Sequence, residues 1–175
     1  MISRPSEAEY PPGYAGYIAA VPEADVLAVL EAQPEVIGRL ARDLTPEQER
    51  HAYAPGKWTV RQVLGHLSDA ERCFGFRAFC FGRLDQNPLP GFEEDEYVRQ
   101  ADFDRVPAEE LAREFATVRA GNLAFLRRLE SDRWQNRGTA NGKLVSVRAL
   151  GFTMAGHVRH HLRVLQERYG VSLSG

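Results

Sequence analysis

The chain has 175 residues, a formal net charge of −2, 43% apolar residues and 26% charged residues. These are ordinary fractions for a globular domain, so they exclude intrinsic disorder and collagen-like structure. The lack of a basic excess argues against a general nucleic-acid binder, and the lack of an apolar run of about 18 residues argues against a membrane span.

Residues 1–12 are polar and contain prolines, with no apolar core of the kind that a signal peptide has. We therefore expect a cytoplasmic protein. The length predicts one domain over residues 1–175, of which residues 1–21 form an N-terminal extension.

Apolar residues recur at helical spacing from about residue 23 to residue 44 and predict the first long helix. Pro34 lies inside this stretch and is expected to kink or split the helix. The sequence Thr45-Pro46-Glu47-Gln48 then combines a capping threonine, a first-turn proline and a glutamine, which predicts a short helical turn.

The second predicted helix covers residues 60–83, and Thr59 with Gln62 forms a capping box at its start. The proline-rich stretch 87–91 ends it, and the acidic residues 93–96 lead into a short helix or turn at the rim. Cys73 and Cys80 both fall in this helix, so they cannot link distant segments and a disulfide framework is excluded.

The third predicted helix runs from Pro107 to about Leu129, and the fourth covers residues 146–169, with Gly170 as its C-cap. Between them, Asn141-Gly142 joins two short stretches in the pattern of a β-hairpin. Four long helices predict an all-α fold, an antiparallel four-helix bundle with one short hairpin before the last helix. The links before and after the third helix are long enough for a crossover, so their lengths leave the topology open.

The histidines are the most informative polar residues. At about 100° per residue, His161 falls within the apolar stripe of the last helix and His157 falls beside it, so the two stack toward the bundle interior. His160 falls on a more polar face, where we expect a solvent-facing residue, with a proton shuttle near the site as the alternative. Two imidazoles at positions i and i+4 can bind one metal ion. His66 lies at the edge of the apolar stripe of the second helix and would complete a three-histidine site with positions open to water, which is typical of a catalytic metal site.

Three neutral imidazoles favour zinc, nickel, copper or iron over magnesium or calcium. The competing interpretation is that the histidines are hydrogen-bonded core residues. Gly65 and Gly156 directly precede two of them. A glycine inside a helix costs roughly 1 kcal/mol relative to alanine, so we expect either close helix packing or room for a ligand at these positions.

Three stretches resemble one family: residues 56–71 (GKWTVRQVLGHLSDAE), residues 88–95 (PLPGFEED), and residues 145–156 leading into His157-Val158-Arg159-His160-His161-Leu162. Together they resemble the DinB-like (YfiT-like) superfamily of metal-dependent enzymes. The likeness covers about residues 22–170.

The resemblance implies an antiparallel four-helix bundle, often dimeric, in which His66, His157 and His161 hold a divalent metal, usually zinc or nickel. It also implies chemistry on a low-molecular-weight thiol, such as bacillithiol or mycothiol, as in the better characterised relatives. Relatives often carry a glutamate after the first histidine of the last motif, where this chain has Val158 and Arg159.

Several polar residues near these motifs are candidates for supporting roles. A ligand histidine needs an acceptor for its second ring N–H, and the acidic candidates are Asp69, Glu71, Asp95 and Glu96, each of which has a solvated helix charge as its alternative. Arg77 shares the His66 face and would bind a carboxylate of a cosubstrate thiol, or else pair with Glu71 or Glu114. Cys73, Trp58 and Trp134 are expected to be packing residues.

We therefore expect a metal-dependent hydrolase or thiol S-transferase in which metal-bound water or thiolate attacks a small electrophile. The weak catalytic candidates among the side chains are Asp69 and Arg77. The alternative is a non-catalytic, dimeric metal- or ligand-binding module in stress response. The expected partners are a small-molecule substrate and a second copy of the chain, without nucleic acid or membrane.

Overall fold

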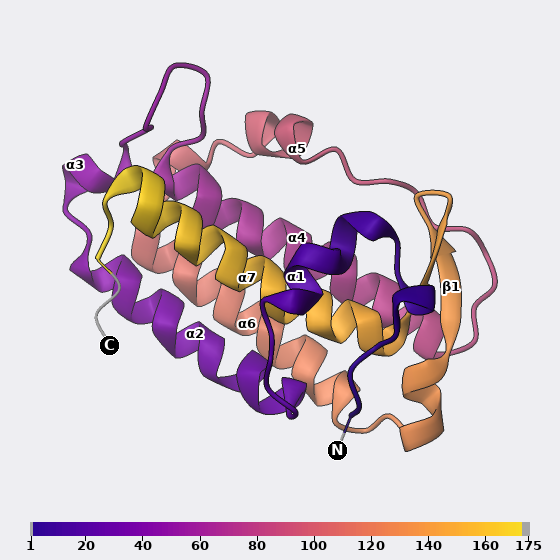
Figure 1. Cartoon of the computed structure of the whole chain (residues 1–175). Coiled ribbons are helices and arrows are strands. Elements are labelled where there is room, and N and C mark those ends of the chain that lie inside the picture. Colours follow the sequence, from indigo (N-terminus) through magenta and orange to yellow (C-terminus); the bar gives the residue numbers. More distant parts are fainter. Residues whose placement is uncertain (1, 173–175) are drawn as a thin grey trace.

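The computed structural model describes residues 2–172, so the first residue and the last three residues of the predicted domain lie outside the described part. Four long helices form a bundle, with shorter helices at its ends and sides and one hairpin (Figure 1). The helices are α1 (Ala15–Ala19), α2 (Val26–Asp43), α3 (Pro46–Glu49), α4 (Val60–Gly82), α5 (Glu94–Gln100), α6 (Ala108–Leu126) and α7 (Val147–Tyr169), and the strands are β1 (Arg137–Ala140) and β2 (Lys143–Ser146). The predicted all-α bundle with a hairpin before the last long helix is confirmed.

The link between α4 and α6 is a long crossover connection, because it joins two neighbouring helices that run in the same direction (Figure 1). α6 and α7 each pack against both α2 and α4, which places α2 diagonally opposite α4. α4 and α6 run in the same direction, while α2 and α7 run the opposite way (Figure 1). The link over residues 83–107 therefore returns the chain along the length of the bundle, and α5 lies within it. This link is the crossover that its length alone left undecided.

Local capping fixes the helix ends largely as predicted. The Thr59 hydroxyl accepts from the Gln62 N–H at 3.1 Å, and the Gln62 side chain accepts from the Thr59 N–H at 3.0 Å. Gly170 ends α7 with φ of 68°, a left-handed conformation that glycine adopts without strain. The third long helix is the exception, because α6 ends at Leu126, earlier than predicted.

Pro34 does not split the first long helix, since α2 is continuous from Val26 to Asp43. Proline has no N–H to donate to the carbonyl of Leu30, four residues earlier. The buried Arg119 side chain donates to that carbonyl instead, at 2.9 Å. A partner from α6 therefore replaces the hydrogen bond that the proline removes.

The hairpin anchors the crossover. Asn141 and Gly142 have φ values of 51° and 69°, as a two-residue type I′ turn requires. Leu89, in the link between α4 and α5, donates to the Thr139 carbonyl at 2.9 Å and accepts from the Asn141 N–H at 3.0 Å. One end of the crossover is thereby fixed beside the turn.

In the described part of the predicted N-terminal extension, residues 2–21 pack against the bundle. α1 packs on α7, and Arg4 donates to the carbonyls of Ile18 and Val21 at 2.6 and 2.9 Å. Glu9 is 1% exposed and pairs with Arg148 at 2.5 Å. Burial raises the pKa of Glu9, but the hydrogen bonds from Arg148 and neighbouring serines outweigh it and lower that pKa to about 2.

The glycines that precede the site histidines are explained by close packing. A Cβ added at Gly65 would lie 2.4 Å from the Phe103 ring, and one added at Gly156 would lie 1.9 Å from the Tyr17 carbonyl oxygen. The second contact is with backbone, so it cannot be relieved by a side-chain rotation. Of the two expected reasons for these glycines, the structure confirms close packing.

Gly156→Ala is therefore expected to destabilise the protein by about 1–3 kcal/mol, because it forces α1 away from α7. Gly121→Ala is the matched control, since a Cβ there meets nothing within 4 Å and alanine favours a helix by up to about 1 kcal/mol. Urea unfolding of both variants measures the difference. Equal stability of the two variants would show that α1 does not hold the position described.

Two apolar clusters fill the bundle, one around Phe81 and Leu150 and the other around Phe115 and Leu64. A buried polar layer of Gln33, Glu71 and Arg119 lies between them. Among the residues described, no helix combines the length and apolar character needed to cross a bilayer.

Candidate metal centre

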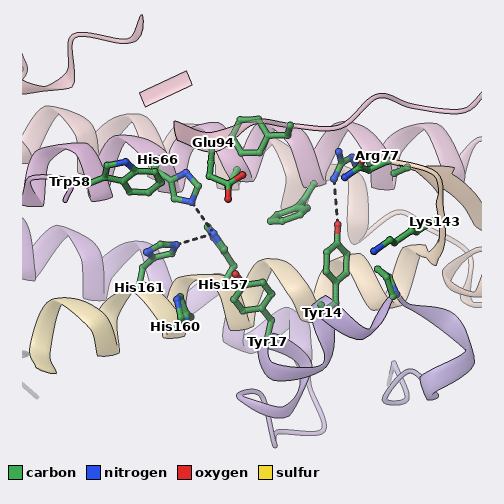
Figure 2. A pocket seen from close by; sticks show the side chains of 17 residues that line it. Tyr14, Tyr17, Trp58, His66, Arg77, Glu94, Lys143, His157, His160 and His161 are labelled. Atoms are coloured by element: carbon green, nitrogen blue, oxygen red, sulfur yellow. Dashed lines mark hydrogen bonds between the residues drawn. The ribbon is translucent and has the colours of Figure 1, made fainter. Parts of the chain in front are cut away.

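Three histidines from two antiparallel helices converge at one point of the bundle (Figure 2). α4 supplies His66, and α7 supplies His157 and His161. The Nε2 atom of His157 lies 3.1 Å from Nε2 of His66 and 3.1 Å from Nε2 of His161. His66 and His157 are 4% and 6% exposed, and His161 is half-buried. The helical wheel grouped the same three residues.

Hydrogen bonding alone cannot satisfy this arrangement. A ring nitrogen carries either one N–H or one in-plane lone pair. His157 Nε2 faces two other Nε2 atoms, so at most one of the two contacts is a well-formed hydrogen bond in any tautomer. Three nitrogens bound to one tetrahedral zinc at about 2.0–2.1 Å would lie roughly 3.3 Å apart, close to the observed spacing. The donor set therefore fits a divalent metal ion with imidazole ligands.

The electrostatic environment keeps these imidazoles neutral. Burial lowers the pKa of His66 to about 4, against a smaller opposing effect of Asp95. Burial, followed by the neighbouring histidines, also lowers the pKa values of His157 and His161 well below the usual range. Neutral imidazole is the form that binds metals, so the lone pairs are available at neutral pH.

The acidic candidates for orienting these histidines have other partners. Glu71 binds Arg119 and Asn122, Asp69 lies 3.6 Å from Arg72, and Glu96 pairs with Arg99. Nδ1 of His66 is buried and has no hydrogen-bond partner among the described residues. Asp95 influences the pKa of His66 but forms no hydrogen bond with it in the described part. None of the four acidic residues therefore orients His66 through a hydrogen bond in this structure.

The histidines form one end of a cavity of about 430 Å³. Figure 2 shows Arg77, Tyr14 and Lys143 at the other end, with Tyr17 and Glu94 nearer the histidines. A second cavity of about 370 Å³ adjoins it and is lined by His160, His161 and Trp58 among others. Asp69 lines neither of these cavities, whereas Arg77 lines the first.

His160 does not face open solvent as the wheel predicted. It is half-buried, lines both cavities, and lies edge-on to Tyr17 with ring centroids 5.5 Å apart. The physical reason is that the short helix α1 packs on a face of α7 that the three other long helices leave uncovered. The wheel was therefore wrong about this residue because it considered one helix alone.

Most of the remaining cavity wall comes from segments without a recognisable sequence pattern. Tyr14 and Tyr17 come from the N-terminal segment, Glu94 from α5, and Lys143 from β2. Trp58, predicted to be a packing residue, also lines the cavity, and its ring centroid lies 4.7 Å from that of His66. Trp134 is a core residue with 2% exposure, as predicted.

The positions after His157, where the family resemblance leads us to expect a glutamate, hold Val158 and Arg159 and supply no carboxylate to the site. Val158 is 1% exposed in the apolar core, and Arg159 pairs with Glu23 at 2.6 Å on the surface. Glu94, on the crossover, is the carboxylate that lines the main cavity.

Comparison with known proteins agrees with this geometry. Residues 30–165 match the DinB superfamily. Over 83 residues the chain is 31% identical to a protein of Geobacillus thermodenitrificans named "Putative metal-dependent hydrolase"; the match covers 47% of this chain and spans about half (47%) of that relative.

The fold is similar to that of YfiT from Bacillus subtilis, with a TM-score of 0.73 and 20% identity over 98% of this chain and 95% of that one. YfiT is described as a probable metal-dependent hydrolase with an unusual four-helix bundle topology. With the family match over most of the sequence, the chain belongs to the DinB superfamily.

Proposed function

We propose that the protein is a metal-dependent enzyme, a hydrolase or a thiol S-transferase, that binds one divalent ion through His66, His157 and His161. The observation that carries this proposal is the convergence of three neutral Nε2 atoms on one buried point beside a cavity. Zinc or nickel suits an all-imidazole donor set better than magnesium or calcium.

A divalent ion in this site would lower the pKa of a bound water or thiol and so supply a nucleophile near neutral pH. Hydrolysis agrees with the description of the Geobacillus relative, and thiol transfer agrees with the family resemblance. The substrate is then a small electrophile, with a low-molecular-weight thiol such as bacillithiol as cosubstrate for transfer.

Tyr17 supplies a hydrogen-bond donor from the protein itself in this proposal. Its ring centroid lies 5.4 Å from that of His157. Burial, followed by the charge of Glu94, raises the pKa of the Tyr17 hydroxyl. Tyr17 therefore stays protonated at neutral pH and can donate a hydrogen bond to a group that reacts beside the histidines.

Elemental analysis of tag-free protein tests the metal site. We expect about one zinc or nickel ion per chain in the wild type, since three ligands with an open position form a complete catalytic site. His161→Ala and His157→Ala are expected to lose the ion, while His160→Ala, on the same helix turn, keeps it. Metal content that His161→Ala leaves unchanged would contradict the ligand set.

A screen with small esters and with thiol–electrophile pairs separates the enzyme from the binding module. Turnover that chelation removes and zinc or nickel restores supports the enzyme. A loaded protein that turns over no member of the screen supports the non-catalytic module instead.

We also propose that the protein acts as a cytoplasmic homodimer, as the family resemblance implies, and binds no nucleic acid. Phe76 and Phe79 on α4 are 57% and 46% exposed and lie beside a groove between α4 and α6. Burial of these rings against a second copy would remove apolar surface from water.

A further inference from the structure

Arg77 is unusual among the buried arginines. Arg61, Arg77 and Arg119 are 7%, 6% and 0% exposed. Arg61 binds Glu49 at 2.6 Å and Arg119 binds Glu71 at 2.7 Å, but no carboxylate of the described residues pairs with Arg77. A buried cation without an anion is costly, so its position at a cavity calls for a ligand.

Most of the hydrogen-bonding capacity of Arg77 is unused. Its Nη2 donates to the Pro90 carbonyl at 2.9 Å, and its Nη1 lies 3.4 Å from the Tyr14 hydroxyl. A guanidinium has five N–H donors, and groups of the described residues accept from two of them. The bond to Pro90, in the crossover segment that the hairpin anchors, holds the guanidinium in one orientation.

The surroundings of Arg77 favour a negative charge. Lys143 lines the same end of the cavity and forms no ion pair with the described residues. Glu94 is the one acidic residue among those that line the cavity, and Figure 2 shows it toward the histidine end. The cavity is therefore cationic at the Arg77 end.

The two ends are joined by an apolar wall. His66 and Arg77 lie on one side of α4, eleven residues apart, which corresponds to about 16 Å along the axis. Ala70 and Phe74 line the cavity on the turns between them. A ligand that contacts both ends must be elongated and apolar in its middle.

We propose that Arg77 binds the carboxylate of an elongated substrate whose apolar middle lies along Ala70 and Phe74 and whose reacting group lies beside the three histidines. A planar guanidinium matches the two oxygens of a carboxylate through parallel hydrogen bonds. The placement of the reacting group rests on the proposed function, while the binding of the carboxylate does not.

Calorimetric titration of metal-free protein with octanoate and with octanamide tests the carboxylate site alone. We expect octanoate to bind wild type more tightly than octanamide by roughly tenfold to a hundredfold, the range of a hydrogen bond to a charged group. Arg77→Gln should remove this preference. Arg72→Gln, on the outside of the same helix with Glu114 as its partner, should keep it.

Circular dichroism and urea unfolding check that Arg77→Gln still folds. If it does not, Arg77→Lys replaces it, because lysine keeps the positive charge but lacks the planar pair of N–H donors. We expect this variant to bind octanoate more weakly than wild type. Equal binding of octanoate and octanamide to wild type, or an unchanged preference in a folded Arg77 variant, would overturn the proposal.

A second titration separates this proposal from the metal site. Cobalt(II)-loaded protein is titrated with an ω-mercaptooctanoate, and the cobalt–thiolate absorption reports the thiol end. Octanoate binding that depends on Arg77, without any cobalt–thiolate band, would support the carboxylate site and contradict thiol binding at the metal. A cobalt–thiolate band, together with equal binding of octanoate and octanamide, would support thiol binding at the metal and contradict the carboxylate site.

Discussion

Replacement of Arg119 by alanine is expected to lower the free energy of unfolding by about 3–5 kcal/mol, the usual cost of removing one partner from a buried ion pair. Arg119 is fully buried and donates to both oxygens of Glu71, at 2.7 and 2.9 Å. It also donates to Gln33 at 2.8 Å and to the Leu30 carbonyl at 2.9 Å. Its loss leaves a buried carboxylate and a buried carbonyl without their donors.

Urea unfolding of metal-free protein measures this effect without a contribution from metal binding. Arg113→Ala is the matched control, because it lies on the same helix and its nearest carboxylates, on Glu109 and Glu110, are 3.8 and 3.9 Å away on the exposed face. An exposed pair of this kind contributes about 0–1 kcal/mol. Similar losses in the two variants would contradict a dry polar layer at Arg119.

A double variant separates two contributions to the free energy of unfolding: the cost of leaving the Glu71 carboxylate unpaired, and the net stabilisation by the ion pair itself. Glu71→Leu with Arg119→Met removes both charges and keeps apolar volume in the layer. We expect it to be clearly more stable than Arg119→Ala, since apolar substitution of a whole buried ion pair is often neutral or stabilising. A double variant as unstable as Arg119→Ala would show that the hydrogen bonds to Gln33 and Leu30 dominate.

The long helices and the hairpin were predictable because each depends on short-range patterns. Thr59 with Gln62, Asn141-Gly142 and Gly170 specify backbone conformations within a few residues. The histidine cluster was predictable for a related reason. His66, His157 and His161 lie at the edges of apolar stripes, and stripes of facing helices meet.

The buried polar layer has a local signal in the sequence. Arg119 is four residues from both Phe115 and Leu123, so it lies within the apolar stripe of α6. Glu71 lies within the stripe of α4 in the same way. A charged residue inside an apolar stripe, with an opposite charge inside another, predicts a buried pair. Which stripes meet depends on the crossover, and chain length alone does not fix it.

The cavity wall was less accessible to sequence reasoning. Tyr14 and Tyr17 belong to 3₁₀ turns and to a five-residue helix, which are too short to show a period. Their position depends on Gly156, where only the absence of a side chain allows the Tyr17 backbone to approach. Such a contact joins residues far apart in sequence, so neither segment predicts it alone.

Metal-free protein is expected to lose stability as the pH falls from about 6.5 toward 4. Burial lowers the pKa of folded His66 to about 4, whereas an unfolded histidine titrates near 6.5. Between these values the unfolded chain binds more protons than the folded chain, so the free energy of unfolding decreases with falling pH. His66 alone accounts for about 3 kcal/mol over this range, and His157 and His161 act in the same direction.

Urea unfolding at a series of pH values, in the presence of a chelator, measures this dependence. His66→Gln is expected to flatten the curve between pH 6.5 and 4, while His51→Gln, at an exposed position before α4, leaves it unchanged. The stabilisation from Glu9 is lost as the pH falls from its ordinary pKa of 4.5 toward about 2. Glu9 is present in all of these variants, so its contribution at the low end of the series cancels from the comparison.

Added zinc extends the same argument to the loaded protein. Protons and metal compete for the imidazole nitrogens, so zinc should stabilise the folded chain strongly at neutral pH and progressively less as the histidines become protonated. If zinc stabilises wild type and His66→Gln equally at every pH, then His66 does not bind the ion. If the chelated wild type and His66→Gln also share one pH profile, the His66 ring is hydrated and the cavity wall described around it is open.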